Sequence, residues 1–361
     1  MERQTSTMCI ACGASNEPYI DEIWDDRYGA PGKFSILKCV SCGQMVTSPL
    51  LADEDLPALY SRYYPRREVD LTALRKEADA VLLEGAESKR YREGTDNQGH
   101  YLVKPGQRVL DIGCGSCVSL LEVRNLGGES WGIETDPNVR AIADHFGLTV
   151  HIGSIHDNPF PSVDFDLIVL NQVIEHVPDP VALLELVRGR LRPGGKVVLA
   201  FPNADSLNKR VSGRQWINWH VPYHLHHYNK KSFALIAKRA GYDVVGVRSI
   251  TPNLWTILQL RAFGDDTVEG QPSTAWTSSG PSVPKEASFA MRWKNRFASR
   301  ATGLAHGLIG PVNRMVDKLG MSDSLLVELR KDYQATMTVI EPCSAARDGD
   351  GQTSQDCAGH Q

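Results

Sequence analysis

The sequence predicts an α/β protein built on a mostly parallel sheet. Six short runs rich in β-branched residues begin at Arg108, and helix-length segments separate them. A glycine-rich turn follows the first run, which is where a parallel sheet places a ligand-binding loop. Two pairs of cysteines near the N-terminus add a small module to this core.

Composition narrows the class of protein. The chain has 361 residues, of which 42% are hydrophobic and 23% charged, so one large α/β domain with appended segments is expected. The net charge of −4 argues against a broad affinity for nucleic acid. We find no apolar run long enough to span a membrane and no signal-peptide core, and we expect a cytoplasmic protein in a reducing compartment.

The four N-terminal cysteines have the spacing of a zinc ribbon. Cys9 and Cys12 form one Cys-x2-Cys pair, Cys39 and Cys42 form another, and a glycine follows each pair. Such a pair lets two thiolates of one turn face one ion, and four thiolates complete the tetrahedron that Zn²⁺ prefers. We predict a structural zinc in a module of residues 1–50. Four unrelated buried cysteines are the alternative.

The next segments change from helix to alternating strand and helix. Residues 51–100 are predicted to be mostly helical, most clearly in ALRKEADAVLLEGAESKRY at 73–91. The six predicted strands that follow are RVLDI, SWGIE, LTVHI, DLIVL, KVVLAF and DVVGVRSI. Together they indicate a large domain over residues 101–340.

The C-terminal third adds an insertion to this domain, at 264–320. Residues 264–288 are rich in Gly, Ser, Thr and Pro and are predicted to be a mobile linker. Residues 289–320 are predicted to be an amphipathic helix with a basic polar side. SLLVELRK, at 324–331, is one further predicted strand, and the polar residues 341–361 are expected to be a disordered tail.

The turn Gly113-Cys114-Gly115 closely follows the predicted strand that carries Asp111. Glycine lets the backbone approach a ligand closely, and the next helix directs free N–H groups to the same place. About 20 residues further on, the second strand ends in Glu134, whose carboxylate suits the two ribose hydroxyls of a nucleoside. The pattern predicts a nucleoside cofactor rather than a turn without a ligand.

A third Cys-x2-Cys pair, Cys114 and Cys117, lies inside this turn. We interpret its spacing as coincidence, because four thiolates already suffice for one zinc. Thioredoxin-like redox chemistry is the alternative, since a helix N-terminus lowers the pKa of a thiol. The residues that usually surround that redox motif are missing.

Four segments resemble the successive motifs of class I S-adenosylmethionine-dependent methyltransferases, in the same order: VLDIGCGSC, GIETD, FDLIVLNQVIEHV and LRPGGKVVLAFPN. The resemblance covers roughly residues 105–250. It implies a Rossmann-like, seven-stranded sheet whose last strand is antiparallel, for which SLLVELRK is the candidate. A nicotinamide enzyme of the same fold class is disfavoured, because Val118 stands where its third glycine belongs.

The resemblance also implies a binding site for S-adenosyl-L-methionine. Its methionine moiety, ribose and adenine would be lined by Asp111, Gly113, Cys114, Gly115, Glu134, Ser154, Ile155, Asn171 and Gln172. Among these, Glu134 would bind the ribose, and Ser154 and Ile155 would flank the adenine. Cys117 replaces a glycine that is frequent in the family. We expect binding to survive, because that position faces helix packing.

The segment RQWINWHVPYHLHHY, at 214–228, is the candidate acceptor region. Histidine titrates near neutral pH and can take a proton from a hydroxyl. Similar methyltransferases often carry a His-Leu-x-x-aromatic stretch here, so His224 is the first candidate for a general base and His176 the second. His226 and His227 are alternatively surface residues. A metal site of His220 with His224 is disfavoured, because Pro222 interrupts helical geometry.

Aromatic residues in the same segment have two interpretations. Trp216, Trp219 and Tyr223 either stack on a sugar or aromatic ring of the acceptor, or pack a lid. The fourth-strand motif is NQVIEH rather than the Pro-Pro-aromatic turn of enzymes that methylate exocyclic amines of bases. FPN, after the fifth strand, contains no cysteine, which disfavours the covalent mechanism at a base carbon.

These observations predict a methyltransferase acting on an oxygen or carbon of a small molecule, such as a sugar nucleotide, a polysaccharide precursor or a secondary metabolite. An RNA methyltransferase that grips nucleic acid with its zinc ribbon is the alternative, although residues 1–50 lack interleaved basic and aromatic residues. A third hypothesis is a non-enzymatic protein that uses its zinc ribbon to bind a partner. Peripheral membrane contact through 289–320 is a further prediction, with a helical pair packed on the core as its alternative.

Overall fold

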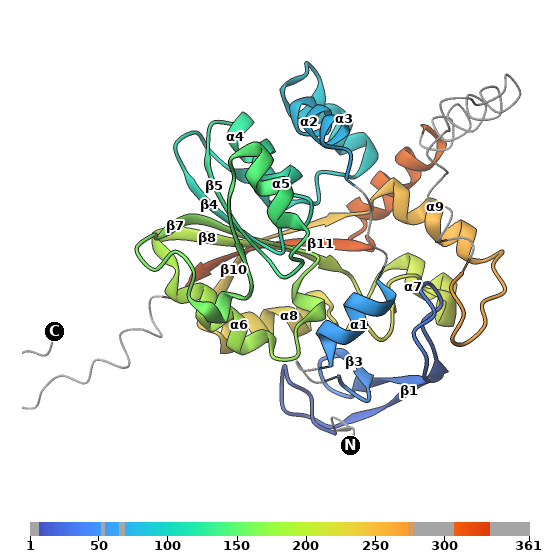
Figure 1. Ribbon diagram of the computed structural model, residues 1–361. Coiled ribbons are helices and arrows are strands. Elements are labelled where there is room, and N and C mark those ends of the chain that lie inside the picture. Colours follow the sequence, from blue (N-terminus) through green and yellow to red (C-terminus); the bar gives the residue numbers. More distant parts are fainter. Residues whose placement is uncertain (1–6, 52–54, 65–68, 274–275, 277–306, 333–361) are drawn as a thin grey trace, which may run out of the picture. The chain divides into compact units, whose positions relative to one another are not determined.

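Seven strands form one sheet in the order β10-β11-β8-β7-β4-β5-β6 (Figure 1). In chain order they are β4 (Arg108–Ile112), β5 (Glu129–Glu134), β6 (Thr149–Ile152), β7 (Phe165–Asn171), β8 (Leu191–Pro202), β10 (Tyr242–Ile250) and β11 (Ser324–Lys331). Strands β4 to β8 are parallel, and β11 lies antiparallel between β8 and β10. The predicted sheet and its antiparallel last strand are confirmed. This computed structural model describes residues 7–51, 55–64, 69–273, 276 and 307–332.

Helices cover both faces of this sheet. Figure 1 shows α4 and α5 on one face and α6 and α8 on the other. The helices that follow the first strand of this sheet are α4 (Val118–Asn125), α5 (Val139–Phe146), η3 (Ile155–Asp157), η4 (Ile174–His176), α6 (Pro180–Gly189), α7 (Leu207–Ser212), η5 (Gly213–Gln215), α8 (Lys230–Arg239) and α9 (Asn253–Ala262). Residues 307–318 form a further helix within the described chain.

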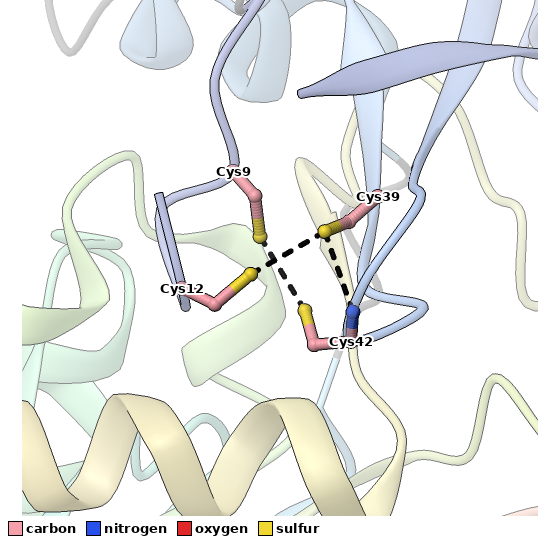
Figure 2. Close-up of side chains that lie close together, drawn as sticks. All are labelled: Cys9, Cys12, Cys39 and Cys42. Carbon is pink, nitrogen blue, oxygen red and sulfur yellow. Dashed lines mark hydrogen bonds between the residues drawn. The ribbon is translucent and has the colours of Figure 1, made fainter. Parts of the chain in front are cut away.

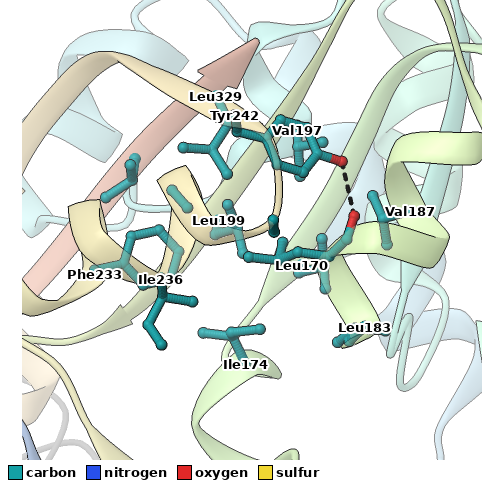
Figure 3. Packing of buried hydrophobic residues seen from close by; sticks show 14 of the residues in the cluster. Leu170, Ile174, Leu183, Val187, Val197, Leu199, Phe233, Ile236, Tyr242 and Leu329 are labelled. Atoms are coloured by element: carbon teal, nitrogen blue, oxygen red, sulfur yellow. Dashed lines mark hydrogen bonds between the residues drawn. The ribbon is translucent and has the colours of Figure 1, made fainter. Parts of the chain in front are cut away.

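The core follows the two-residue period of the strands. In β7, Leu167 and Val169 face one apolar cluster, whereas Ile168 and Leu170 face the other. The second cluster packs α6 and α8 against β7, β8 and β11, with Phe233 among its members (Figure 3). These central strands are buried on both faces. Because they run parallel, their carboxyl ends meet at one edge of the sheet.

The stretch at 73–91 is helical, as predicted, and is divided between separate helices. They are α2 (Leu71–Asp79), which runs on into η1 (Ala80–Leu82), and α3 (Ala86–Glu93). Gly85 has a left-handed backbone with φ of 73° and separates them, a conformation that glycine adopts without strain. The preceding helix is α1 (Leu56–Tyr63), and η2 (Gly99–Leu102) leads into the sheet.

The N-terminal residues form a second, antiparallel sheet in the order β1-β2-β3-β9. Its strands are β1 (Asn16–Ile23), β2 (Phe34–Cys39), β3 (Met45–Ser48) and β9 (His226–His227). Met45 pairs with His227, and Val46 pairs with His226. The predicted zinc module therefore shares a sheet with the predicted acceptor segment. Met1–Lys331 form one compact unit and Asp332–Gln361 a second, of which only Asp332 is described.

Part of the predicted mobile linker is held against the N-terminal module. Ser273 donates from its backbone N–H to the carbonyl of Arg27 at 2.9 Å, and Tyr28 bridges to Pro272. Pro272 and Ser273, at least, have defined partners in the N-terminal module. Apart from position 276, the remainder of the linker, residues 289–306 and the tail at 341–361 lie outside the described residues. In the described part of the chain, no helix has the length and apolarity needed to cross a membrane.

Candidate functional site

The four N-terminal cysteines converge on one point (Figure 2). The Sγ atoms of Cys9 and Cys42 are 3.5 Å apart, and those of Cys12 and Cys39 are 3.4 Å apart. Thiolates around one zinc at about 2.3 Å lie about 3.8 Å from each other, so the donor set and its spacing fit the ion.

The local backbone explains this convergence. Gly13 and Gly43, which follow the two pairs, both have φ of 74°, and their N–H groups donate to the carbonyls of Cys9 and Cys39. The two turns are thus closely similar knuckles, as the glycines in the sequence predict. By contrast, Cys114 and Cys117 are buried in an apolar cluster of the core, away from this group.

Four parallel strands carry the predicted cofactor residues to one edge of the large sheet. Asp111 lies in β4, Glu134 ends β5, Ser154 follows β6, and Asn171 ends β7. Because carboxyl ends of parallel strands meet at one edge, residues far apart in sequence become neighbours there. This is the edge at which an open α/β sheet binds its ligands.

The glycine-rich turn touches Glu134 directly. The N–H of Gly115 donates to Oε2 of Glu134 at 2.8 Å, while Oε1 accepts from the N–H groups of Thr135 and Asp136. Gly113 has φ of 76°, and a Cβ there would lie 2.6 Å from Val173 Cγ2, so only glycine fits. The structure therefore brings together the first two motifs that the sequence indicated.

The remaining predicted cofactor residues line the same edge. The Ser154 hydroxyl caps η3 by accepting from the N–H of His156, and Ile155 is buried beside it. The side-chain oxygen of Asn171 accepts from the N–H of Gly99 at 2.9 Å. Gln172 has φ of 54° and donates its backbone N–H to the carbonyl of Ala200.

Several residues of the strand ends and of the acceptor segment have buried polar atoms without a hydrogen-bond partner. Among the described residues, they include Asp111 Oδ1, Gln172 Nε2, both carboxyl oxygens of Glu175, His220 Nε2 and the Tyr223 hydroxyl. Native proteins leave few such atoms unpaired, and a cluster of them indicates a place where a ligand supplies the missing partners. Burial raises the pKa of Asp111 to about 6, although its hydrogen bond from Ser119 lowers it.

His176 and His224 lie together on the acceptor side, with ring centroids 4.7 Å apart. Nδ1 of His224 is 2.9 Å from the carbonyl of Asn218, and Nδ1 of His176 is 2.9 Å from the carbonyl of Tyr223. A carbonyl only accepts, so each Nδ1 carries the proton and each Nε2 keeps a lone pair.

Burial keeps both rings neutral. It lowers the pKa of His176 to about 4 and that of His224 well below its usual range, because a charged imidazolium loses its hydration there. The hydrogen bonds to the backbone carbonyls oppose this effect but do not cancel it. Both rings are therefore unprotonated at Nε2 at neutral pH and able to accept a proton, although the lowered pKa makes each a weaker base than a solvated imidazole.

Glu175 is a site residue that the sequence analysis missed. Its carboxyl is buried, and burial raises its pKa to about 8, so it carries a proton at neutral pH. A carboxyl oxygen of Glu175 and one ring nitrogen each of His176 and His224 all lie within 4.8 Å of one another. The acidic residue directly after the apolar pair Val173-Ile174 was a signal that could have identified it, because buried carboxyl groups are rare without a function.

Tyrosines from distant segments surround these histidines. The hydroxyl of Tyr60, from α1, lies 2.8 Å from Nδ1 of His176. Tyr28, from the connection between β1 and β2, packs edge-on against Tyr64, His220 and Tyr223. No local pattern in the sequence distinguishes Tyr28 or Tyr60, since only the tertiary fold brings them here.

Other residues of the segment pack against the N-terminal sheet. Trp216 and Trp219 are buried in one apolar cluster with residues of β1, β2 and β3, so packing accounts for both. The surface alternative for His226 and His227 is wrong: both are buried, because they pair with β3 as strand β9. His220 and His224 do not lie on a helix, although their ring centroids are 4.8 Å apart.

The seven-stranded sheet is that of the S-adenosylmethionine-dependent methyltransferases that the sequence resembles. Residues 71–247 match a family model described as a methyltransferase domain. The chain therefore carries a methyltransferase domain and is an enzyme of this class.

Two bacterial relatives are both named ubiquinone biosynthesis O-methyltransferase. The one from Cupriavidus pinatubonensis is 27% identical over 175 residues, which cover 45% of this chain and 70% of that protein. The one from Cereibacter sphaeroides is 31% identical over 161 residues, which cover 41% of this chain and 65% of that protein. The matched part thus leaves about a third of each relative unmatched.

Solved structures show weaker likeness. A SAM-dependent methyltransferase from Archaeoglobus fulgidus has a TM-score of 0.39 and 17% identity, over 71% of this chain and 94% of that chain. Another, from Mesorhizobium loti, has a TM-score of 0.39 and 16% identity, over 63% of this chain and 92% of that chain. Likeness at this level carries no argument about substrate.

Proposed function

We propose that this enzyme transfers a methyl group to a hydroxyl oxygen of a small-molecule acceptor, with His224 or His176 as general base. The observation that carries this proposal is the pair of neutral histidines, His224 buried and His176 half-buried, whose protonated Nδ1 atoms face backbone carbonyls. A hydroxyl is a poor nucleophile until its proton is removed, so such a base has a clear task.

The cofactor residues of the proposal are those at the strand ends. Asp111, Gly113, Cys114 and Gly115 would hold the methionine moiety together with Asn171 and Gln172, Glu134 would hold the ribose, and Ser154 and Ile155 would flank the adenine. S-adenosyl-L-methionine, when bound, supplies a methyl group on a positively charged sulfur. The contact between Gly115 and Glu134 supports this assignment, because it joins the turn and the ribose residue into one surface.

On the acceptor side, Nε2 of either histidine would take the hydroxyl proton. His224 is preferred. Nδ1 of His176 already has two partners, the hydroxyl of Tyr60 and the carbonyl of Tyr223, which hold that ring in place. Tyr60 stays protonated, since burial raises its pKa. Its hydroxyl is therefore placed to orient an acceptor beside His176 rather than to remove a proton.

We also propose that the four cysteines bind one structural Zn²⁺. Four protein ligands leave no open position, so the ion would stabilise the module rather than react. The carbonyl of Cys42 accepts from the side chain of Asn229, and Gln44 lies between Cys9 and His226 at hydrogen-bond distance from each. These contacts connect the metal to the segment that carries His224.

The names of the relatives support oxygen as the reacting atom, because both reported proteins are named O-methyltransferases. Neither is named as an RNA methyltransferase, so the alternative of an RNA substrate gains nothing from them. The buried character of the histidine site also favours a small acceptor over a polymer.

The test is a transfer assay with the full chain and isotopically labelled S-adenosylmethionine. A panel of small phenols, catechols and sugar derivatives is incubated with the enzyme, and mass spectrometry with NMR locates the transferred methyl group. We expect label on oxygen, and a loss of label with His224→Ala. Label on carbon or nitrogen, or full activity of both His224→Ala and His176→Ala, would contradict the proposal.

A further inference from the structure

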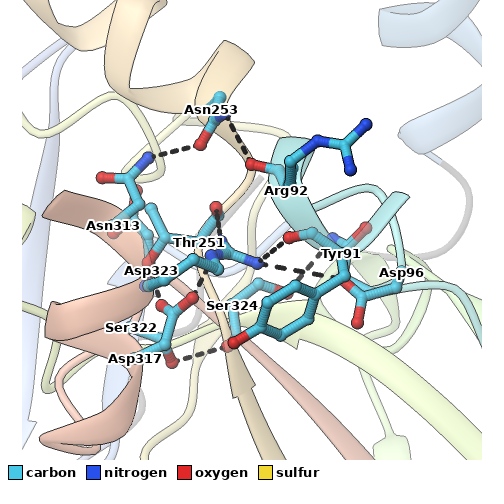
Figure 4. A network of polar contacts seen from close by, with 12 residues as sticks. Tyr91, Arg92, Asp96, Thr251, Asn253, Asn313, Asp317, Ser322, Asp323 and Ser324 are labelled. Atoms are coloured by element: carbon cyan, nitrogen blue, oxygen red, sulfur yellow. Dashed lines mark hydrogen bonds and ion pairs between the residues drawn. The ribbon is translucent and has the colours of Figure 1, made fainter. Parts of the chain in front are cut away.

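The helix α9 and the helix at 307–318 bury polar side chains. Asn253 and Gln259 are the buried residues of α9, and Asn313 is buried in the second helix. Asn313 donates to the side-chain oxygen of Asn253 at 2.9 Å, and Asn253 donates to the carbonyl of Arg92 (Figure 4). The inner faces of both helices are therefore fixed by hydrogen bonds.

The outer faces are apolar. On the second helix and its end, Leu308, Val312, Met315 and Leu319 are between 55% and 68% exposed. They recur at intervals of four, three and four residues, so they form one stripe along the helix. We call these four residues the apolar stripe. On α9 and just after it, Leu254, Leu260 and Phe263 are exposed as well.

This arrangement is the reverse of an ordinary surface helix, which buries its apolar side and exposes its polar side. Of the seven exposed residues between 307 and 319, only Lys318 is polar. Proteins rarely leave such continuous apolar surface in water, and where they do, it marks a surface that binds something.

The charges beside the stripe indicate what binds. In the described ranges 253–263 and 307–319, the exposed charged residues are Arg261 and Lys318, and both are basic. The sequence just before the stripe, residues 285–300, holds five basic residues and one acidic residue. Acidic residues such as Asp266 and Glu269 follow α9 only in the next connection.

We propose that the apolar stripe docks this enzyme on an anionic lipid surface. Its four side chains would enter the boundary between headgroups and acyl chains, and Arg261 and Lys318 would meet lipid phosphates. A lipid surface needs only an apolar strip flanked by cations, whereas a protein partner also needs complementary shape and polar pairing. The proposal is independent of the acceptor and of the base.

Vesicle flotation with the full-length protein tests this docking. Vesicles of phosphatidylcholine alone are compared with vesicles that also contain phosphatidylglycerol. We expect the protein to float with the anionic vesicles, and the bound fraction to fall with rising salt, because salt screens the basic residues. The double variant Val312→Ser/Met315→Ser should reduce the partition coefficient roughly tenfold or more.

The matched control is Val245→Ser/Val247→Ser, which removes two exposed valines from β10 and should leave flotation unchanged. Arg261→Glu/Lys318→Glu should remove the preference for anionic vesicles. Unchanged S-adenosylmethionine binding and thermal unfolding show that each variant is folded. The proposal is overturned if the wild type stays unbound, or if the stripe variant floats as well as the wild type. It is equally overturned if light scattering shows a dimer that the stripe variant dissociates while vesicles do not bind.

Discussion

The two halves of the site are built in different ways. In the cofactor half, each residue lies at or next to the end of a strand, and neighbours such as Gly115 and Glu134 come from successive βα units. In the acceptor half, His176 meets Tyr60 of α1, and His220, which lies beside His224, meets Tyr28 of the N-terminal module. Local turn geometry determines the first half, whereas the second exists only after distant segments have packed.

This difference has a consequence for the cysteine module. It contributes three strands to the sheet that holds His226 and His227, and its β1–β2 connection contributes Tyr28. The module is therefore expected to affect acceptor chemistry, although it lies outside the part of the chain that matches the methyltransferase family. Mutations that separate cofactor binding from turnover test this division.

The largest difference between the effect on turnover and the effect on cofactor binding is expected from a change at the proposed base. His224→Ala should lower turnover by about 100- to 10,000-fold, which is the usual contribution of a general base. Affinity for S-adenosylmethionine, measured by calorimetry, should stay within about twofold, because His224 lies in the acceptor half. The matched control is His226→Gln, which replaces another buried histidine of the same segment. An equal loss in both variants would show that packing, not proton transfer, is affected.

Removal of the metal should have the next largest effect. Cys39→Ser/Cys42→Ser should release zinc, measured by elemental mass spectrometry, and lower turnover by about tenfold or more, because metal and fold are coupled. Cofactor affinity should change much less. Cys114→Ala/Cys117→Ala should keep the zinc. If the second variant loses the metal and the first retains it, the assignment of ligands is wrong.

The ribose assignment predicts a smaller, specific effect on the cofactor half. Glu134→Ala should weaken S-adenosylmethionine binding by about 1–3 kcal/mol, the cost of leaving polar partners unpaired. That corresponds to about 5- to 150-fold in the dissociation constant. Glu129→Ala, at the exposed start of the same strand, is the control. Unchanged affinity of the Glu134 variant would remove this residue from the ribose site.

The smallest effect concerns stability and pH. Burial raises the pKa of Glu175 to about 8 in the folded state, whereas the unfolded carboxyl titrates near its model value of 4.5. Between these values the unfolded chain binds fewer protons, so stability falls as pH rises from about 4.5 to 8. Glu175→Gln should remove this pH dependence. The melting temperature of the variant minus that of the wild type should therefore be a few degrees larger at pH 8 than at pH 5. Parallel melting curves of wild type and variant across this range would contradict the buried, protonated state.

The sequence predicted the elements that depend on local signals and missed the contacts that depend on packing of distant segments. The six strands from RVLDI to DVVGVRSI and the last strand were identified, because apolar runs and glycine turns are local signals. Gly85 divides the helical stretch at 73–91, a boundary that was not predicted, because a single glycine in a helical pattern is an ambiguous signal. His226 and His227 are buried by pairing with β3, some 180 residues away along the chain, which no local pattern contains. Tyr28 and Tyr60 were missed for the same reason.

The place of β11 between β8 and β10 also constrains the order in which the sheet folds during synthesis. The sheet cannot close until residues 324–331 have left the ribosome, although β10 is finished at residue 250. At about 5–20 residues per second, the roughly 70 intervening residues take about 4–15 s to synthesise. During that time the edge of β8 is an open template for strands of other nascent chains. The insertion that carries the apolar stripe thus sets the interval in which this protein depends on protection from aggregation.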